Sequence, residues 1–251
     1  MKRRLFTIIL LFVISLTIQA SPQAEIDKAN KAYMAGFFEN SIPIYEKVIA
    51  DGLASPELYY NLGNAYFKTN NLPSAILNYE RALKLEPGNE DFIYNLGVAN
   101  SRIVDKIEVL PELFYIRWWK QLKSLFSPDS WAKFAIITFF LLFINIAIFL
   151  LTRTINGRKI FFSTGILLLF LNMVGGIIAW QTNTESKNQK AAIVFAPTLP
   201  VKSSPDESSI DLFVIHEGLK VKVIDKIGEW NEIRIANGSK GWVKTENLEP
   251  V

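Results

Sequence analysis

The chain has 251 residues, a formal net charge of +3, and hydrophobic residues at half of its positions. The small net charge gives no case for nucleic-acid binding, and the hydrophobic share exceeds what a soluble domain needs. There is no cysteine and only one histidine, His216, which excludes disulfides, thiolate metal sites and cysteine nucleophiles. These absences argue against an enzyme and against a bound cofactor or metal.

The first twenty residues combine a basic start with a short apolar core. Basic residues at positions 2–4 precede the apolar run 5–18, and the small residue Ala20 follows. This pattern is typical of a secretory signal peptide, here residues 1–20, and an uncleaved anchor is the alternative. Under either interpretation the remainder of the chain is directed to export.

Residues 22–104 repeat themselves with a period of 34. Gly63 and Gly97 stand 34 apart (97 − 63) within matching Tyr-Asn-Leu-Gly stretches, and Tyr45 and Tyr79 share that spacing (79 − 45). This period with these residue types resembles the tetratricopeptide repeat, in which two helices cross at small residues. The middle copy is the most complete, and the third keeps only its first helix. We therefore predict a domain of stacked α-helix pairs.

The resemblance implies a concave face, built from the first helix of each repeat, that binds extended or helical peptides. Its inward positions include asparagines, whose amides can both donate to and accept from a peptide backbone. We expect one ladder between Asn61 and Asn95 and another between Asn30 and Asn64; solvated helix residues are the alternative. The predicted groove residues are Asn30, Tyr33, Tyr60, Asn61, Asn64, Phe67, Lys68, Tyr94, Asn95 and Arg102.

Residues 105–131 mix tryptophan, other apolar residues and basic residues at helical spacing. Such a mixture indicates an amphipathic helix lying in the lipid headgroup region. A helix packed against the last repeat is the alternative.

Two apolar stretches, 132–151 and 160–180, each have about the ~20 residues that a helix needs to cross a bilayer. The short segment 152–159 joins them, so the pair forms a hairpin that returns the chain to its starting side. Three basic residues in this segment favour its retention in the cytoplasm, but Arg117, Lys120, Lys123 and Lys133 flank the other end of the first span. The charge rule alone is therefore equivocal, and the export signal decides the orientation. Asn145 and Asn172 lie at different depths in the two spans, so we predict that they do not bond each other.

After a polar linker, 181–190, the pattern changes to short alternating strands, which predicts a small all-β barrel over 191–251. Asn237-Gly238 is a tight-turn signal within it. Together with Trp230 and Gly241-Trp242-Val243, this pattern resembles a bacterial SH3-type domain. The predicted strands are Ala192–Phe195, Leu212–Ile215, Leu219–Ile224, Glu229–Ile235 and Gly241–Lys244.

The order of these modules resembles the BatE family of the Bacteroides aerotolerance operon. The resemblance implies a multi-domain protein of the bacterial inner membrane, with two spans and with its repeat and SH3-like domains in the periplasm. It further implies a non-enzymatic scaffold for other Bat-family membrane proteins in envelope stress or oxygen tolerance, with the lipid bilayer as its second partner. The alternative function is a cell-wall sensor or anchor whose SH3-like domain binds peptidoglycan peptides.

Overall fold

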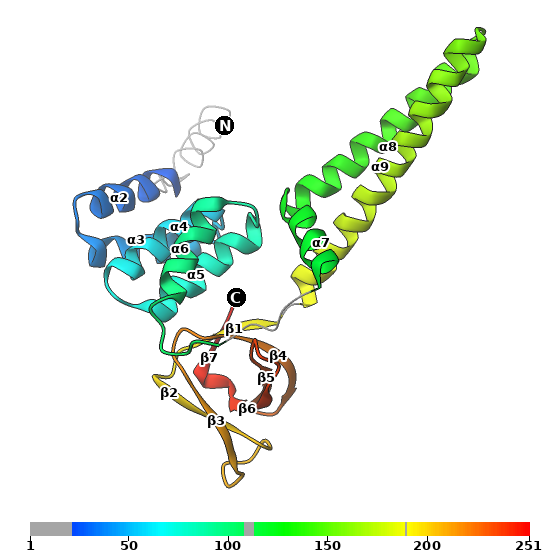
Figure 1. The fold of residues 1–251 in the computed structure, drawn as a ribbon. Coiled ribbons are helices and arrows are strands. Elements are labelled where there is room, and N and C mark those ends of the chain that lie inside the picture. The colour runs from blue at the N-terminus through cyan, green and yellow to red at the C-terminus, as the bar shows by residue number, and fades with distance from the viewer. Residues whose placement is uncertain (1–21, 108–112, 189) are drawn as a thin grey trace, which may run out of the picture.

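The chain is described here in a computed structural model, which covers residues 22–107, 113–188 and 190–251. The predicted signal peptide, 1–20, lies outside the described residues. Figure 1 shows three modules: a domain of short helices, a long helical hairpin that projects away from it, and a small domain of strands. The carboxyl end of the chain lies between the helical domain and the strands.

The helical domain stacks five short helices, and the predicted tetratricopeptide-type α-helical domain is confirmed. Side chains of Ser55, Asn71 and Asn89 begin three of these helices by accepting a hydrogen bond from a backbone N–H of the first turn. A Cβ added to Gly63 would lie 2.8 Å from the ring of Tyr79, so glycine lets two helices of one repeat cross closely. The helices are α2 (Pro22–Met34), α3 (Phe38–Ala50), α4 (Pro56–Lys68), α5 (Leu72–Leu85) and α6 (Glu90–Asn100).

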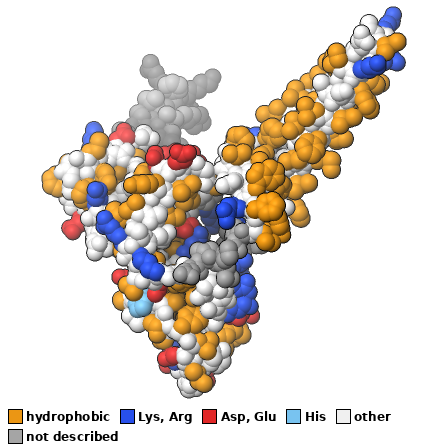
Figure 2. Space-filling model, in the orientation of Figure 1, with side chains coloured by type: hydrophobic (Ala, Val, Ile, Leu, Met, Phe, Trp, Pro, Cys, Tyr) orange, Lys and Arg blue, Asp and Glu red, His pale blue; other side chains and the backbone are white. Residues whose placement is uncertain are grey.

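Two apolar helices, α8 (Pro128–Leu151) and α9 (Ile155–Asn188), form the hairpin. Both are long and apolar enough to cross a membrane. The 24 residues of α8 extend over about 36 Å, more than the ~30 Å of a bilayer's hydrocarbon core. Hydrophobic side chains cover the visible surface of the hairpin, and Lys and Arg side chains gather at its tip (Figure 2).

The few polar side chains inside the hairpin bond across it. Asn145 Nδ2 donates to Thr164 Oγ1 at 2.7 Å, and Asn172 Nδ2 donates to the carbonyl of Ala135 at 2.7 Å and to Thr138 Oγ1 at 3.1 Å. The two asparagines do not bond each other, as predicted. Each amide instead joins α8 to α9, because an amide packed among apolar side chains needs a hydrogen-bond partner.

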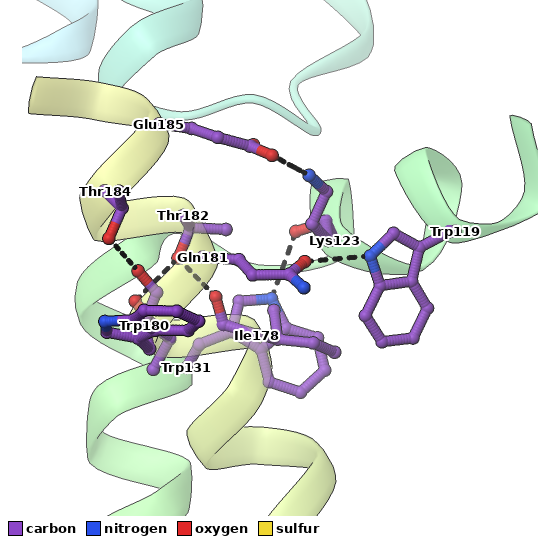
Figure 3. Close-up of polar contacts among 10 residues, drawn as sticks. Trp119, Lys123, Trp131, Ile178, Trp180, Gln181, Thr182, Thr184 and Glu185 are labelled. Carbon is purple, nitrogen blue, oxygen red and sulfur yellow. Dashed lines mark hydrogen bonds and ion pairs between the residues drawn. The ribbon is translucent and has the colours of Figure 1, made fainter. Parts of the chain in front are cut away.

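The predicted linker 181–190 differs from the structure, because α9 continues as a helix to Asn188. Helix α7 (Phe114–Ser124) lies against this extension and supplies partners for its polar side chains. Trp119 Nε1 donates to Gln181 Oε1 at 3.0 Å, and Lys123 Nζ lies 2.6 Å from a carboxylate oxygen of Glu185 (Figure 3). We call these two contacts the brace.

The start of α8 is fixed to the same helix α7. Trp131 is buried, and its indole Nε1 donates to the carbonyl oxygen of Lys123 at 3.0 Å. Lys123 therefore contacts both helices of the hairpin, α8 through its main chain and α9 through its ammonium group (Figure 3). Helix α7 thus packs mainly against the base of the hairpin. Its end also lies close to the helical domain, because a Cβ added to Gly88, in the turn before α6, would lie 2.4 Å from the main-chain oxygen of Ser124.

The strands form one antiparallel sheet of seven strands, ordered β3-β2-β6-β5-β4-β1-β7, which curls around its own core (Figure 1). The predicted all-β domain is confirmed, but β2 and β7 were not among the predicted strands. Each contains a proline, and a proline within a run of residues argues against predicting a central strand there, because it has no backbone N–H to donate. Pro200 is tolerated because β2 pairs with β6 only at Lys202. The strands are β1 (Ala191–Val194), β2 (Thr198–Lys202), β3 (Asp211–His216), β4 (Lys220–Ile227), β5 (Trp230–Arg234), β6 (Lys240–Lys244) and β7 (Leu248–Pro250).

The sheet domain and the helical domain share one hydrophobic core. Ile76 of α5 and Ile103 after α6 belong to the same buried cluster as Val194, Leu219 and Val221 of the sheet domain. Burial of apolar surface is the main force that holds such a joint together. We call the packing of Ile76 and Ile103 against the sheet domain the joint.

Polar contacts surround the joint. The backbone N–H of His216 donates to Asp105 Oδ2 at 2.6 Å, and the imidazole Nδ1 lies 2.9 Å from Asp105 Oδ1. On the other side Lys220 Nζ lies 2.6 Å from Glu80 Oε2. His216 ends β3 and connects the sheet domain to the segment after α6.

Gly218 tests the joint. Its φ is +83°, and an added Cβ would lie 2.7 Å from Ile103 and 3.2 Å from Ile76. Gly218→Ala should therefore lower the free energy of unfolding by about 1–3 kcal/mol beyond the strain of a left-handed alanine. The measurement is chemical denaturation of the full chain in detergent.

Gly228→Ala is the matched control. Gly228 also has a positive φ, +59°, but nothing lies within 4 Å of its Cβ position. Gly228→Ala should lower the free energy of unfolding only by the cost of a left-handed alanine, about 1–2 kcal/mol. Equal losses in the two variants would contradict the joint.

Candidate peptide-binding groove

The groove predicted from the repeat lies on the side of the helical domain that the sheet domain leaves uncovered. Helix α5, the second helix of its repeat, packs against β1. The predicted groove residues lie on the first helices α2, α4 and α6 and in the turn that follows α6. The sheet domain therefore occupies the second-helix side of the stack.

The predicted asparagines form hydrogen bonds between repeats. Asn30 Oδ1 accepts from Asn61 Nδ2 at 3.3 Å, and Asn64 Oδ1 accepts from Asn95 Nδ2 at 3.0 Å. The expected ladder pairs were therefore wrong. A residue on one first helix faces the residue 31 positions later, not 34 (61 − 30 and 95 − 64), since consecutive first helices are displaced by about one turn.

Each of the two accepting asparagine oxygens also receives a hydrogen bond from one buried tyrosine. Tyr45 OH donates to Asn30 Oδ1 at 2.6 Å, and Tyr79 OH donates to Asn64 Oδ1 at 2.7 Å. Burial raises the pKa of Tyr45 to about 12, with a smaller contribution from Tyr33. The phenols therefore remain protonated donors at neutral pH. We call this repeated set of bonds the asparagine lattice.

A cavity of about 310 Å³ lies between the first helices and brings together side chains far apart in the sequence. Aromatic rings supply its apolar surface, and the amides of Asn64 and Asn95 supply polar groups. Burial, with Tyr60 as a further cause, raises the pKa of Tyr33, so this phenol too is a neutral hydrogen-bonding group. The cavity is lined by Tyr33, Tyr60, Asn64, Phe67, Lys68, Tyr79, Asn95 and Val98.

Cations stack on aromatic rings at one end of the groove. The Arg102 guanidinium carbon lies 4.3 Å from the ring centroid of Phe67, and Lys68 Nζ lies 6.0 Å from that of Phe38. Stacking of this kind orients a cation while leaving its charge unneutralised. Acidic residues Glu57 and Asp91 stand in the first turns of α4 and α6, at the opposite end. The groove is therefore polarised along the helix axes.

The structure brings six of the ten predicted residues together around the cavity. Asn30 and Asn61 belong to the asparagine lattice outside it, Arg102 stacks on Phe67, and Tyr94, with 71% of its side chain exposed, does not line it. Sequence reasoning missed Tyr79 and Val98 as lining residues. For Tyr79 a signal was present. Its position 15 residues after Asn64, repeated by Tyr45 after Asn30, was the available signal. Among the residues described, no three His, Cys, Asp or Glu side chains converge on a metal site.

Comparison with known proteins agrees with the repeat. A family model of the TPR repeat, the tetratricopeptide type, matches residues 63–103. Similar solved structures include MamA residues 41 to the end from Desulfovibrio magneticus RS-1 and a MamA RS-1 ArsTM double mutant. Each is 26% identical, with a TM-score of 0.33, over 34% of this chain and 48% of the other, so the match spans about half of those chains. No curated protein matches this chain.

The asparagine lattice predicts a stability loss at Asn64. Asn64→Ala removes the acceptor of both Tyr79 OH and Asn95 Nδ2. Leaving the Tyr79 hydroxyl unpaired should lower the free energy of unfolding by about 1–3 kcal/mol, while Asn95 Nδ2 keeps its hydrogen bond to Tyr60 OH at 2.7 Å. Chemical denaturation of the full chain in detergent, followed by far-ultraviolet circular dichroism, measures the loss.

Asn40→Ala provides the control, because Asn40 is exposed on α3. A surface substitution of this kind should change stability by no more than about 0.5 kcal/mol. If Asn64→Ala proved as mild as Asn40→Ala, the lattice would have no structural role.

Proposed function

We propose that this chain is a non-enzymatic membrane scaffold, which binds a segment of a protein partner in the groove of its tetratricopeptide-type domain. The observation that carries the proposal is the cavity between α2, α4 and α6, lined by aromatic rings and asparagine amides and left uncovered by the sheet domain. Aromatic rings bind side chains of a peptide and amides bind its backbone.

The proposed partners are other Bat-family membrane proteins in an envelope-stress or aerotolerance complex, and the proposed location is the bacterial inner membrane. The joint supports a topology in which both ends of the hairpin face one side. Ile76 precedes the hairpin and Leu219 follows it, yet both are buried in one core. Two segments that share a core must occupy the same compartment, which the exported amino-terminal signal makes the periplasm.

Helix α7 is the proposed contact with lipid headgroups. Its exposed side chains include Phe114 and Trp118, and Leu125 directly follows it, while Trp119 and Lys123 turn toward α9. Exposed tryptophan and phenylalanine beside basic residues are typical of helices in the membrane interface. The brace would keep this helix at the level where the hairpin leaves the bilayer.

The topology predicts a pattern of thiol labelling. Because the chain has no cysteine, single substitutions report one position each. In spheroplasts, a membrane-impermeant maleimide should label Asn40→Cys on the helical domain and Ser239→Cys on the sheet domain. Thr154→Cys, in the turn between α8 and α9, should react only after the membrane is opened. Labelling of Thr154→Cys in sealed spheroplasts would contradict the topology.

The groove predicts selective crosslinking. A photoreactive amino acid at Val98, which lines the cavity, should trap one or a few proteins in cells. The same group at Lys47, exposed on α3, is the control and should not give these products. Phe67→Ala, which removes a cavity wall, should reduce the crosslinks from Val98 at least fivefold, corresponding to about 1 kcal/mol.

Further outcomes separate the two functions. Identical products from Val98 and Lys47 would mean that the groove is not a binding site. A third crosslinker at Trp242, half-buried on the sheet domain, tests the cell-wall alternative. Crosslinks to wall material from Trp242, with none from Val98, would favour a wall sensor over the scaffold.

A further inference from the structure

The outer face of the sheet domain carries three cations in register. Lys222 of β4 stands directly opposite Arg234 of β5, and Arg234 stands directly opposite Lys240 of β6. All three side chains are exposed, whereas Val221 and Ile233 in the alternate positions are buried. Neighbouring strands are about 4.8 Å apart, so the charges form a continuous row. We call Lys222, Arg234 and Lys240 the cationic row.

None of these three cations has a carboxylate within ion-pair distance in the described part of the chain. Other lysines of the same domain do: Lys202 lies 2.7 Å from Asp211, and Lys244 pairs with Glu207. Like charges that face each other across strands destabilise a sheet. The row therefore costs stability when empty, and an anion placed on it would relieve the repulsion.

A cavity of about 840 Å³ borders the cationic row. Lys222 and Arg234 line it from the sheet domain, and Lys106 lines it from the segment after α6. Asp105 also lines it, but both oxygens of its carboxylate are bonded to His216, one to the backbone N–H and one to the imidazole. The charge on Lys106 is also not neutralised by a described carboxylate, since its Nζ donates to the main-chain oxygens of Asn100 and Ser101. The apolar part of the lining consists mainly of Ile103, Ile107, Leu219, Val221 and Ile235.

The cavity lies beside the helix that leads into the membrane. Lys120 of α7 forms part of its wall, and α7 is held by the brace to α9 just beyond the apolar span. Figure 2 shows Lys and Arg side chains gathered on the flank of the sheet domain near the base of the hairpin. A cationic rim around an apolar floor, next to the level of the headgroups, matches an anionic amphiphile.

We infer that this cavity binds the headgroup of an anionic phospholipid from the bilayer that holds the hairpin. The phosphate oxygens would accept hydrogen bonds from Lys222, Arg234 and Lys106, and the glycerol and upper acyl carbons would cover Leu219 and Ile235. The sheet domain would then bind the membrane directly, in addition to its covalent connection through α9. The inference rests on the proposed membrane insertion of the hairpin.

The experiment uses the full chain in nanodiscs of phosphatidylcholine with or without phosphatidylglycerol. Co-elution of protein and disc is measured first, and its absence would overturn the proposed insertion. Hydrogen–deuterium exchange of β4 and β5 then reports on the cavity. We expect slower exchange when phosphatidylglycerol is present, and weaker protection at high salt, because the attraction is electrostatic.

Lys222→Gln and Arg234→Gln should each raise the phosphatidylglycerol fraction needed for half-maximal protection about fivefold, the effect of one charge near a membrane surface. Lys226→Gln is the matched control: it removes an exposed lysine of the same strand that does not line the cavity. It should leave protection unchanged. All three variants are checked for the unaltered exchange of α4 and α5, so that loss of folding is distinguished from loss of binding.

Two results would overturn the lipid site once insertion is established. One is equal exchange with and without phosphatidylglycerol, or an effect of Lys226→Gln as large as that of Lys222→Gln. The other is full protection of β4 and β5 by free glycerol 3-phosphate when the protein is in discs of phosphatidylcholine alone. The cavity would then bind a soluble anion and not a lipid of the bilayer.

Discussion

The burial of Ile76 and Ile103 against the sheet domain is the constraint on which the rest of the arrangement depends. These side chains precede the hairpin, and their partners around Leu219 follow it. The intervening helices must therefore leave the joint and return to it. In the proposed membrane topology this requirement allows only an even number of crossings, and the hairpin makes two. The core also covers the second-helix side of the repeat and leaves the first-helix side as the available surface.

The asparagine lattice divides the polar groups of the groove into those that stabilise the stack and those that remain for a ligand. Each Asn30 or Asn64 oxygen already accepts from a tyrosine and from the next repeat's asparagine. Those oxygens stabilise the stack and are not available to a ligand. The amide groups that no described residue bonds, together with the aromatic rings, are what the groove offers to a peptide. A partner that binds there would therefore meet a surface already rigid, which lowers the ordering cost of binding.

The sequence predicted the modules well because each has a local signature. The 34-residue period, the two apolar stretches and the alternating strands depend on neighbours along the chain. The joint depends on contacts between Ile103 and Gly218, more than a hundred residues apart, and no local pattern encodes such a contact. The extension of α9 was missed for the same reason: the polar residues after Trp180 are stabilised as a helix by Trp119 and Lys123 of α7.

The site shows the same division. Repeat periodicity identified the helix faces that form the groove, and so most of the cavity lining. It failed for the pairing of the asparagines, because the displacement between consecutive first helices is set by how the repeats pack and not by the period of the sequence. The cationic row also escaped prediction. Lys222, Arg234 and Lys240 are separate in the sequence, and only the strand register brings them together.

The brace and the joint connect the hairpin to the groove through α6. Lys123 contacts both helices of the hairpin, and its neighbour Ser124 approaches Gly88 in the turn that leads into α6. Helix α6 carries Asn95 and Val98 of the cavity wall. A movement of α9 relative to α8 would thus displace α7 and act on α6 over a short path of packed residues. The joint holds Ile103, just after α6, in the core of the sheet domain, so α6 is fixed by α7 before its first residue and by the sheet domain after its last.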